Sequence, residues 1–446
     1  VIDDMGRNFP MSRLLEGDVG SGKTAVAATA AYVVVNTRPL KDSPFSNSQG
    51  LSLARHNFGN LQTAYMAPTE ILATQHFESF IKYFKHLPIN IGLITGSGCR
   101  KFPSKTKVYG PNGGEVNWTN ISRAQLLKWV ANGEIPILIG THALIQKSVN
   151  FKHLALVVID EQHRFGTAQR RNLTRKDKGG NVNAPHLLSM TATPIPRTLA
   201  LTIYGDLDLS LLEEMPAGRK PIITEIITPN KRNETYEEIR KELVAGRQLY
   251  VICPRIFEPD PEKELALNVK SAVEEAKRLK KDIFKEYEIG VLHSKMSKEK
   301  KEEVMQEFTD GNIDILCATS VVEVGVNVPN ATIIIIEGAE RFGLAQLHQL
   351  RGRVIRSTHQ AYCYIFAEAK STKTIERLKA LKTAKNGFEL AELDLALRGA
   401  GELGGTKQWG LSDLGMEAIK NIKMVSAARV EAVRLIQIDP ELTKYP

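Results

Sequence analysis

The sequence predicts an α/β protein with two domains in tandem, each built on a parallel sheet, followed by a helical C-terminal segment. Three observations support this fold class. The length of 446 residues exceeds that of one ordinary domain. Short apolar segments alternate with amphipathic helical ones, which is typical of a parallel sheet with helices on both faces. The alternation begins anew after MPAGRKP at 215–221 and stops near residue 385. We therefore expect domains at 1–215, 216–384 and 385–446.

The composition is that of an ordinary globular protein, with 42% hydrophobic and 24% charged residues. The net charge of +9 is compatible with a polyanionic partner such as nucleic acid, although charge alone does not decide this. Four scattered cysteines without a CxxC pair argue against a zinc ribbon or a disulfide framework and fit a reduced, cytoplasmic setting. No membrane-spanning run or signal peptide is present. Because the chain begins at Val1 without a Met, we expect a fragment whose N-terminal part is missing.

The first domain is predicted from apolar runs separated by helical segments. The predicted strands are 13–15, 63–66, 89–94, 137–139, 156–159 and 186–190, with a helix over 24–35. Two segments rich in Ser, Asn, Pro or Gly, 37–60 and 101–119, interrupt this pattern. We interpret both as surface insertions.

The second domain repeats the alternation. Its predicted strands are 222–227, 248–253, 289–292, 313–318, 332–336 and 361–366, with Lys- and Glu-rich helices over 272–287 and 298–308. The charge runs in these helices indicate solvated faces. From residue 385 onward the sequence predicts a helix, a Gly-rich loop and a second helix.

The segment GDVGSGKT, from Gly17 to Thr24, fits the pattern Gly-x-x-x-x-Gly-Lys-Thr in full. Its glycines allow tight turns that bring backbone N–H groups toward a polyphosphate, Lys23 adds a positive charge and Thr24 a magnesium ligand. A chance Gly-rich turn is a poor explanation for a complete match between a strand and a helix. We therefore predict an ATP and magnesium site. The predicted nucleotide-binding residues in this segment are Gly17, Asp18, Val19, Gly20, Ser21, Gly22, Lys23 and Thr24.

A second segment, VVIDEQHRFG at 157–166, ends an apolar run with two adjacent carboxylates. Asp160 is predicted to hold magnesium opposite Thr24, and Glu161 to orient and deprotonate the attacking water. Alone, this segment would be interpreted as a strand ending in a solvated acidic turn. Together with the glycine-rich loop it predicts ATP hydrolysis.

Further candidates follow these two motifs. Thr191 and Thr193 are small hydroxyl residues after a strand, suited to linking the phosphate site to a neighbouring surface. Arg353 and Arg356 are predicted to face a cleft between the domains and to neutralise charge on the γ-phosphoryl group, although a basic surface helix is the alternative.

Two histidines next to these motifs are interpreted as residues that position the site toward DNA. His163 lies just after the two acids, and His142 lies in GTHAL just after a strand. Single histidines are more often structural than ligands, and no HExxH spacing supports zinc.

Eight segments, taken together, resemble the RecG family of bacterial superfamily-two helicases. They are GDVGSGKT, APTEILATQHF, GTHAL, DEQHRFG, MTATPIPRTLAL, YGDLDLSLL, ERFGLAQLHQLRGRV and LALRGAGELGGTKQ. The resemblance covers nearly the whole chain and its motif specificity is high. It implies two RecA-like (P-loop NTPase) domains with ATP at their interface and a C-terminal helical hairpin with a translocation loop that includes Arg398 and Gln408.

The implied activity is that of a monomeric, ATP- and magnesium-dependent translocase on double-stranded DNA. Such a motor regresses stalled forks and drives Holliday junction branch migration in DNA recombination and repair, in the bacterial cytoplasm and without membrane contact. The resemblance covers the motor portion and not the N-terminal wedge domain of the family.

Three alternatives remain open. A transcription-repair coupling translocase has a similar motor, but that family usually has DEEHRFG where Gln162 stands here. An ATP-binding, DNA-binding fragment with a poorly active motor would follow if Ile355, where the family has Gly, needed a positive φ, at a cost of about 1 to 2 kcal/mol. Asn327, in place of the usual Asp, points the same way. An NTPase that does not act on nucleic acid is the third.

Overall fold

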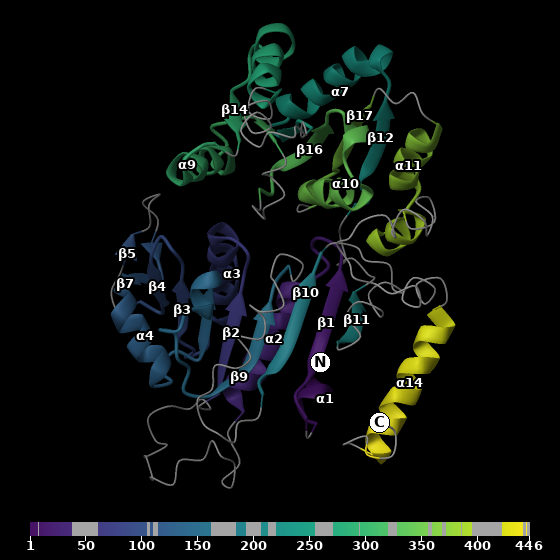
Figure 1. Ribbon diagram of the computed structural model, residues 1–446. Coiled ribbons are helices and arrows are strands. Elements are labelled where there is room, and N and C mark those ends of the chain that lie inside the picture. The colour runs from purple at the N-terminus through teal and green to yellow at the C-terminus, as the bar shows by residue number, and fades with distance from the viewer. Residues whose placement is uncertain are drawn as a thin grey trace. The chain divides into compact units, whose positions relative to one another are not determined.

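The computed structural model describes residues 1–7, 9–37, 61–104, 108–109, 115–161, 184–192, 207–212, 220–254, 271–293, 295–319, 328–355, 359–367, 372–384, 386–394, 422–439 and 443. They form two compact units (Figure 1). The first unit holds the described residues within 1–16, 22–192 and 208–212, and the second those within 17–21, 193–207 and 213–446. The boundaries at 215 and 385 stay predictions.

The first unit contains a nine-stranded sheet in the order β11-β1-β10-β9-β2-β8-β3-β4-β7. The strands from β1 to β3 in this order pair in parallel, and β4 and β7 extend the sheet with antiparallel pairs. The strand bounds are β1 Ser12–Gly17, β2 Gln62–Met66, β3 Ile91–Ile94, β4 Cys99–Phe102, β7 Thr119–Ile121, β8 Ile137–Gly140, β9 Leu154–Ile159, β10 His186–Thr191 and β11 Asp208–Leu212.

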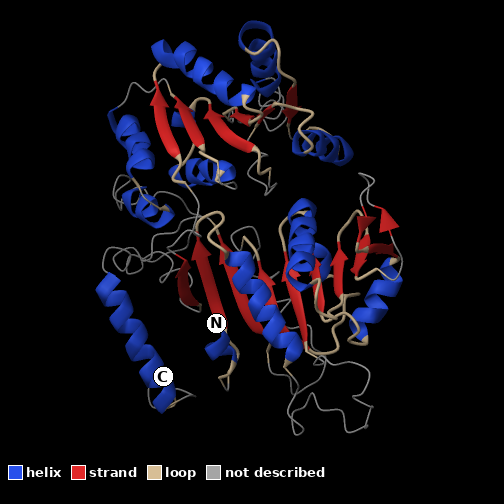
Figure 2. Ribbon diagram, turned by 180° about the vertical axis from the view of Figure 1, so that it is seen from behind, coloured by secondary structure: helices blue, strands red, loops and turns tan. Residues whose placement is uncertain are grey.

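Helices cover both faces of this sheet because side chains alternate along buried parallel strands. On one face lie α2 (Lys23–Asn36) and α3 (Glu70–Phe84), and Figure 2 shows helices covering this face. They pack against residues such as Tyr65 and Val158. On the other face α4 (Arg123–Ala131) and the 3₁₀ turn η1 (His142–Ile145) pack against Met66 and Val157. Helix α1 (Ile2–Met5) precedes β1. The predicted helix over 24–35 and all six predicted strands of this unit are confirmed.

The interpretation of 101–119 as an insertion outside the fold is wrong for its ends. Strand β4 pairs with β3, β7 pairs with β4, and Phe102 and Trp118 are buried. Between them β5 (Val108–Tyr109) and β6 (Glu115–Val116) form a small antiparallel pair. Short antiparallel edge strands lack the apolar run by which we recognised the parallel ones, so the composition of this segment was misleading. The other predicted insertion, 37–60, lies outside the described residues except for Thr37.

The second unit contains a six-stranded, fully parallel sheet in the order β12-β17-β16-β13-β15-β14. All six predicted strands are present, within two residues of the predicted ends. Their bounds are β12 Ile223–Ile227, β13 Gln248–Ile252, β14 Ile289–Leu292, β15 Ile315–Ala318, β16 Ala331–Ile336 and β17 Tyr362–Phe366. The prediction of two parallel-sheet α/β domains is therefore confirmed.

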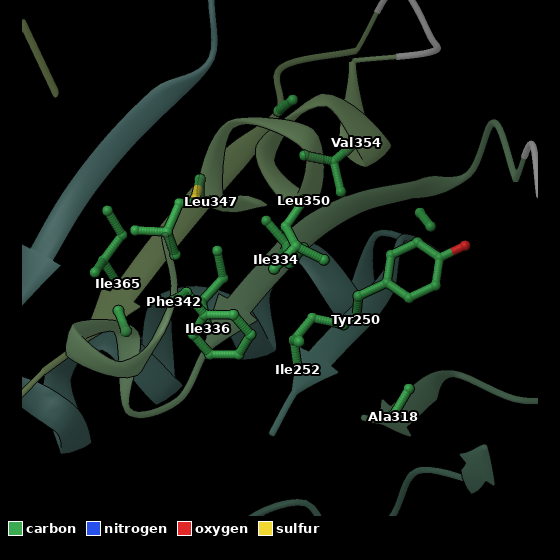
Figure 3. Packing of buried hydrophobic residues seen from close by; sticks show 14 of the residues in the cluster. Tyr250, Ile252, Ala318, Ile334, Ile336, Phe342, Leu347, Leu350, Val354 and Ile365 are labelled. Atoms are coloured by element: carbon green, nitrogen blue, oxygen red, sulfur yellow. The ribbon is translucent and has the colours of Figure 1, made fainter. Parts of the chain in front are cut away.

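Helices also lie on both faces of the second sheet. Tyr250 and Ile334 face a core formed with α9 (Lys298–Thr309), α10 (Leu344–Arg351) and α11 (Thr372–Thr383), and Figure 3 shows Leu347 and Leu350 packed into it. The opposite core is formed with α7 (Arg232–Val244) and a helix over 271–278, which continues as a π-helical turn Leu279–Ile283. That helix ends before the predicted residue 287. The 3₁₀ turns are Pro229–Lys231, Ala339–Arg341 and Gly352–Val354.

Beyond β17 the described part of the chain is helical, as predicted. It comprises α11, a helix over 387–394 and α14 (Ile422–Ile438). All four cysteines are buried and unbridged, in agreement with the cysteine pattern. Within the described residues every helix is too short or too polar to cross a bilayer.

The two sheets share a feature at the first residue of a central strand. Gln62 of β2 is buried, and its amide donates to the carbonyls of Val130 and Ile135, both at 2.9 Å. Gln248 of β13 donates equally to Phe308 and Ile313, at 2.5 and 2.8 Å. In each case the amide ties a helix end and the approach to the neighbouring strand to the central strand. The two α/β units thus share this arrangement of side-chain hydrogen bonds.

We predict that Gln62→Leu loosens the first unit alone. The side-chain oxygen of Gln62 also accepts from the N–H groups of Lys152 and His153, at 2.7 and 3.0 Å, so four buried bonds are lost. At about 1 to 3 kcal/mol for each unsatisfied buried group, protection against hydrogen exchange should fall by at least about 2 kcal/mol in β2, β8 and β9. Gln248→Leu is the matched variant and should loosen β13 and β15 instead. Equal loosening of both units by either variant would contradict this account.

Candidate functional site

The glycine-rich loop connects β1, which ends at Gly17, to α2, which begins at Lys23. Gly20 and Gly22 have φ values of +82° and +100°, so the predicted tight turns are present. A Cβ at Gly22 would meet nothing within 4 Å. Glycine is therefore favoured there by the left-handed backbone conformation and not by a lack of space for a side chain. Gly22 caps α2 without a side-chain hydrogen bond, and the first turn carries no acid. The positive end of this 14-residue helix therefore carries no acidic side chain in its own first turn.

The remaining residues of the site in the first unit follow neighbouring parallel strands. Thr191 is the last residue of β10, and Asp160 directly follows β9. The N–H of Asp160 donates to the carbonyl of Met66 at 2.8 Å, so the pairing of β9 with β2 extends to Asp160. Because β1, β10, β9 and β2 are adjacent and parallel, their carboxyl ends lie along one edge of the sheet. The charge of Lys23 acts on Asp160 across this edge. The structure therefore brings together Lys23, Thr24, Asp160 and Thr191.

Asp160 is a buried carboxylate held on both oxygens. Its Oδ2 lies 2.8 Å from Nε2 of His76 on α3, and its Oδ1 accepts from the N–H of Glu161 at 3.1 Å. Burial by itself raises the pKa of Asp160, but the hydrogen bond and charge of His76, the charge of Lys23 and the Glu161 N–H outweigh burial and lower it. Asp160 is therefore ionised at neutral pH.

Glu161 has an unusual backbone. Among the described residues, Glu161 is the only non-glycine residue with a positive φ, at +52°. A left-handed conformation of this kind costs about 1 to 3 kcal/mol and concentrates at functional sites. The Oε2 of Glu161 accepts from the N–H of Ala192, just beyond β10, at 3.3 Å. The carboxylate is thus directed across the edge of the sheet toward the end of β10.

The donor set at this edge fits a small, hard cation that retains water. Asp160 and Thr24 supply a carboxylate and a hydroxyl, and oxygen is the ligand that Mg²⁺ prefers. Among the described residues no cluster of three or more His, Cys, Asp or Glu side chains forms a closed metal cage. Mg²⁺ is normally bound by one or two protein oxygens together with substrate phosphates, so this sparse set suits it.

Asp18 makes contacts within the second unit, to which residues 17–21 belong. Its Oδ1 accepts from Nε2 of His348 on α10 at 2.8 Å, and both of its oxygens accept from the N–H of Gly387 at 3.2 Å. Arg351 donates to Nδ1 of His348 at 3.1 Å, which leaves Nε2–H to bond Asp18. Burial opposes the charge of Asp18, but these partners outweigh it and lower its pKa. Asp18 therefore fastens the loop to α10 and to the helix over 387–394.

Arg353 lies in the 3₁₀ turn after α10 and is buried. The preceding Gly352 allows close approach to the loop, because a Cβ there would lie 2.8 Å from Cγ2 of Val19. Ile355 follows with φ −85° and ψ 22°, which is ordinary for a β-branched residue. The strain that a positive φ would have caused at Ile355 is therefore absent.

Comparisons with known proteins agree with these motifs. The profile of the DEAD/DEAH box helicase family matches residues 9–202, that of the helicase conserved C-terminal domain 231–358, and that of "ATP-dependent DNA helicase RecG, domain 3, C-terminal" 384–446. The ATP-dependent DNA helicase RecG of Synechocystis sp. is 43% identical over 100% of this chain and 48% of its own length. That of Bacillus subtilis is 43% identical over 98% of this chain and 57% of its own length.

Solved structures are similar as well. A structure of RecG bound to a three-way DNA junction has 38% identity and a TM-score of 0.68 and covers 95% of this chain. Over nearly its whole length the chain is therefore similar to RecG helicases. It spans about half the length of the curated relatives it matches and 48% of the chain in that RecG structure. S. cerevisiae Dbp5 bound to RNA and ADP BeF3 has a TM-score of 0.52 at 15% identity, which reflects the shared fold alone.

The remaining candidates from the sequence lie, with one exception, outside the described residues. Exposed His142 begins η1 after β8, and its role stays a prediction. The other candidates lie outside the described residues: His163, Thr193, Asn327, Arg356, Arg398 and Gln408.

Sequence reasoning missed Tyr65 and His76 in the first unit, and it missed His348, which bonds Asp18 within the second unit. The sequence carried one usable signal, a single histidine within the apolar row of α3 formed by Ala73, Phe77, Phe80 and Phe84. No comparable signal in the sequence distinguished Tyr65 from a core aromatic residue.

We predict that Asp18→Ala exposes the start of the helix over 387–394. The Gly387 N–H and His348 lose their acceptor, and the helix loses a negative charge at its N-terminus. Amide hydrogen exchange over 386–394 should accelerate about tenfold or more, since a charged hydrogen bond contributes roughly 1.5 to 3 kcal/mol. Asp18→Asn keeps one acceptor oxygen and should give an intermediate rate. Unchanged exchange in Asp18→Ala would show that Asp18 does not hold this segment.

Proposed function

We propose that this chain is the motor of an ATP-dependent helicase that translocates on double-stranded DNA and acts on branched DNA. The names of its relatives and the RecG structure with a three-way junction support the proposal. The DNA structures expected as substrates are stalled forks and Holliday junctions, as part of recombination and repair in the bacterial cytoplasm.

The observation that carries the proposal is the match of residues 384–446 to a RecG-specific domain, in addition to two general helicase profiles. The two helicase profiles alone describe many nucleic-acid motors. The additional match favours RecG over a transcription-repair coupling translocase and over an NTPase that does not act on DNA.

The nucleotide phosphates would bind the loop Gly17–Thr24. The uncapped N-terminus of α2 and the side chain of Lys23 provide the positive potential for them. Thr24 and Asp160 are the residues that would hold Mg²⁺, and the ionised state of Asp160 supports this role. When bound, Mg²⁺ neutralises phosphate charge.

Glu161 is the proposed general base. Its carboxylate lies one residue beyond the proposed magnesium ligand, and its bond to the Ala192 N–H limits the directions in which it can point. The strained backbone of Glu161 fits a residue whose position is set by function. In this role Glu161 orients a water molecule and takes its proton as the γ-phosphoryl group departs.

The remaining roles are proposed on the RecG resemblance. Arg353 and Arg356 would stabilise the charge of the transferred phosphoryl group. The residues proposed to couple hydrolysis to DNA movement are His163, Thr191, Thr193, Arg398 and Gln408.

A DNA-binding fragment with a poorly active motor is the second candidate. Its bases were strain at Ile355 and the missing wedge domain, and the ordinary φ of Ile355 removes the first of them. The active motor is therefore the better proposal.

We predict that Lys23→Ala and Glu161→Gln separate nucleotide binding from hydrolysis. Lys23→Ala removes the positive charge that would bind the phosphates, so it should abolish ATP turnover and fork regression. Glu161→Gln keeps the shape but removes the base, so it should bind a fluorescent ATP analogue normally while turnover falls by at least about 100-fold. Exposed Lys82 on α3 provides the control Lys82→Ala, which should behave like the wild type. Wild-type turnover in Glu161→Gln would remove Glu161 from its role.

A further inference from the structure

A buried hydrogen-bond network lies behind Asp160, one of the two residues proposed to hold magnesium. His76 is the link to Asp160, through the 2.8 Å contact between Nε2 and Oδ2. The hydroxyl of Tyr65 lies 3.2 Å from Nδ1 and 3.3 Å from Nε2 of His76. All three side chains belong to the first unit, on β2, α3 and the end of β9. Asp160 is therefore supported by two side chains that belong neither to the glycine-rich loop nor to the acidic motif.

The bond between His76 and Asp160 has one possible direction. A carboxylate can only accept, so the Nε2–H of His76 donates to Asp160. The Tyr65 hydroxyl lies within hydrogen-bond distance of both ring nitrogens, and this contact helps to fix the orientation of the His76 ring.

The surroundings of His76 are rigid. Its ring centroid lies 4.7 Å from that of Tyr65, and Tyr65 meets Phe80 edge to face at 5.4 Å. Tyr65 and Phe80 are fully buried, and His76 is 9% exposed. A polar ring within an aromatic row of α3 has a cost in desolvation that packing alone does not explain. The hydrogen bond to Asp160 explains why a histidine is found at that position.

We propose that His76 and Tyr65 are positioning residues that set the geometry of Asp160 toward Mg²⁺. The proposal rests on the proposed nucleotide site and names two residues that act through Asp160. Outer residues that orient metal ligands typically contribute 10- to 100-fold to metal affinity or activity. The nucleotide itself contacts neither of them in this account, so its metal-free binding should not depend on them.

The test measures Mn²⁺ binding by electron paramagnetic resonance in the presence of saturating ADP. A parallel titration with a fluorescent ADP analogue in EDTA measures metal-free nucleotide binding. His76→Leu should weaken Mn²⁺ binding about tenfold or more and leave nucleotide binding in EDTA within about twofold. His76→Gln keeps an N–H donor for Asp160 and should recover part of the loss. Tyr65→Phe keeps the ring but removes its hydroxyl, and should weaken Mn²⁺ binding less than His76→Leu.

Phe84→Leu is the matched control. Phe84 lies on the same buried face of α3 and packs against Phe80, but no hydrogen bond ties it to the site. An equal loss of Mn²⁺ binding in Phe84→Leu and His76→Leu would overturn the proposal, because helix packing alone would then explain both. Unchanged Mn²⁺ binding in both His76→Leu and Tyr65→Phe would overturn it as well.

The same titrations separate this proposal from the proposed function. If the wild-type chain bound no nucleotide, the proposed function would fail and the role of His76 with it. If the wild type bound and hydrolysed ATP while the His76 and Tyr65 variants kept wild-type Mn²⁺ affinity, the proposed function would stand and only the positioning role would be wrong.

Discussion

The structure of the site depends on one constraint, which is that parallel strands end at a common edge of their sheet. Strands β1, β10, β9 and β2 are neighbours, so segments more than 140 residues apart in the chain meet at this edge. The glycine-rich loop, Asp160 and Thr191 each follow or end one of these strands. Apolar side chains on both faces of the sheet fix the positions of the strands. The polar residues at the strand ends are therefore placed in the same order as the strands.

Polar side chains near this edge are held by specific bonds. Asp160 is fixed on both oxygens, and Glu161 occupies a strained backbone conformation and is restrained by the N–H of Ala192. Such restraints reduce the reorganisation that a reaction requires. Gln62 and Gln248 make equivalent hydrogen bonds at the first residue of a central strand, so the two units share this part of their scaffold.

The sequence predicted what depends on local pattern. Apolar runs located all the parallel strands of both sheets, and the motif around Lys23 together with the acids at 160 and 161 located the site. What it missed depends on tertiary contacts. The edge strands β4 and β7 form because β3 offers them a partner, and His76 is important because a strand 84 residues away ends beside it. The φ of Ile355 likewise depends on the turn that it ends and could not be inferred from its residue type.

The most direct test of the account is the steady-state ATPase rate of this chain without DNA and with linear duplex, a model fork or single strands. The account describes a motor whose hydrolysis is coupled to double-stranded DNA. It therefore predicts a rate that rises at least about tenfold with duplex or fork and much less with single strands. An equal rate under all four conditions, from a chain that binds both ATP and DNA, would contradict it.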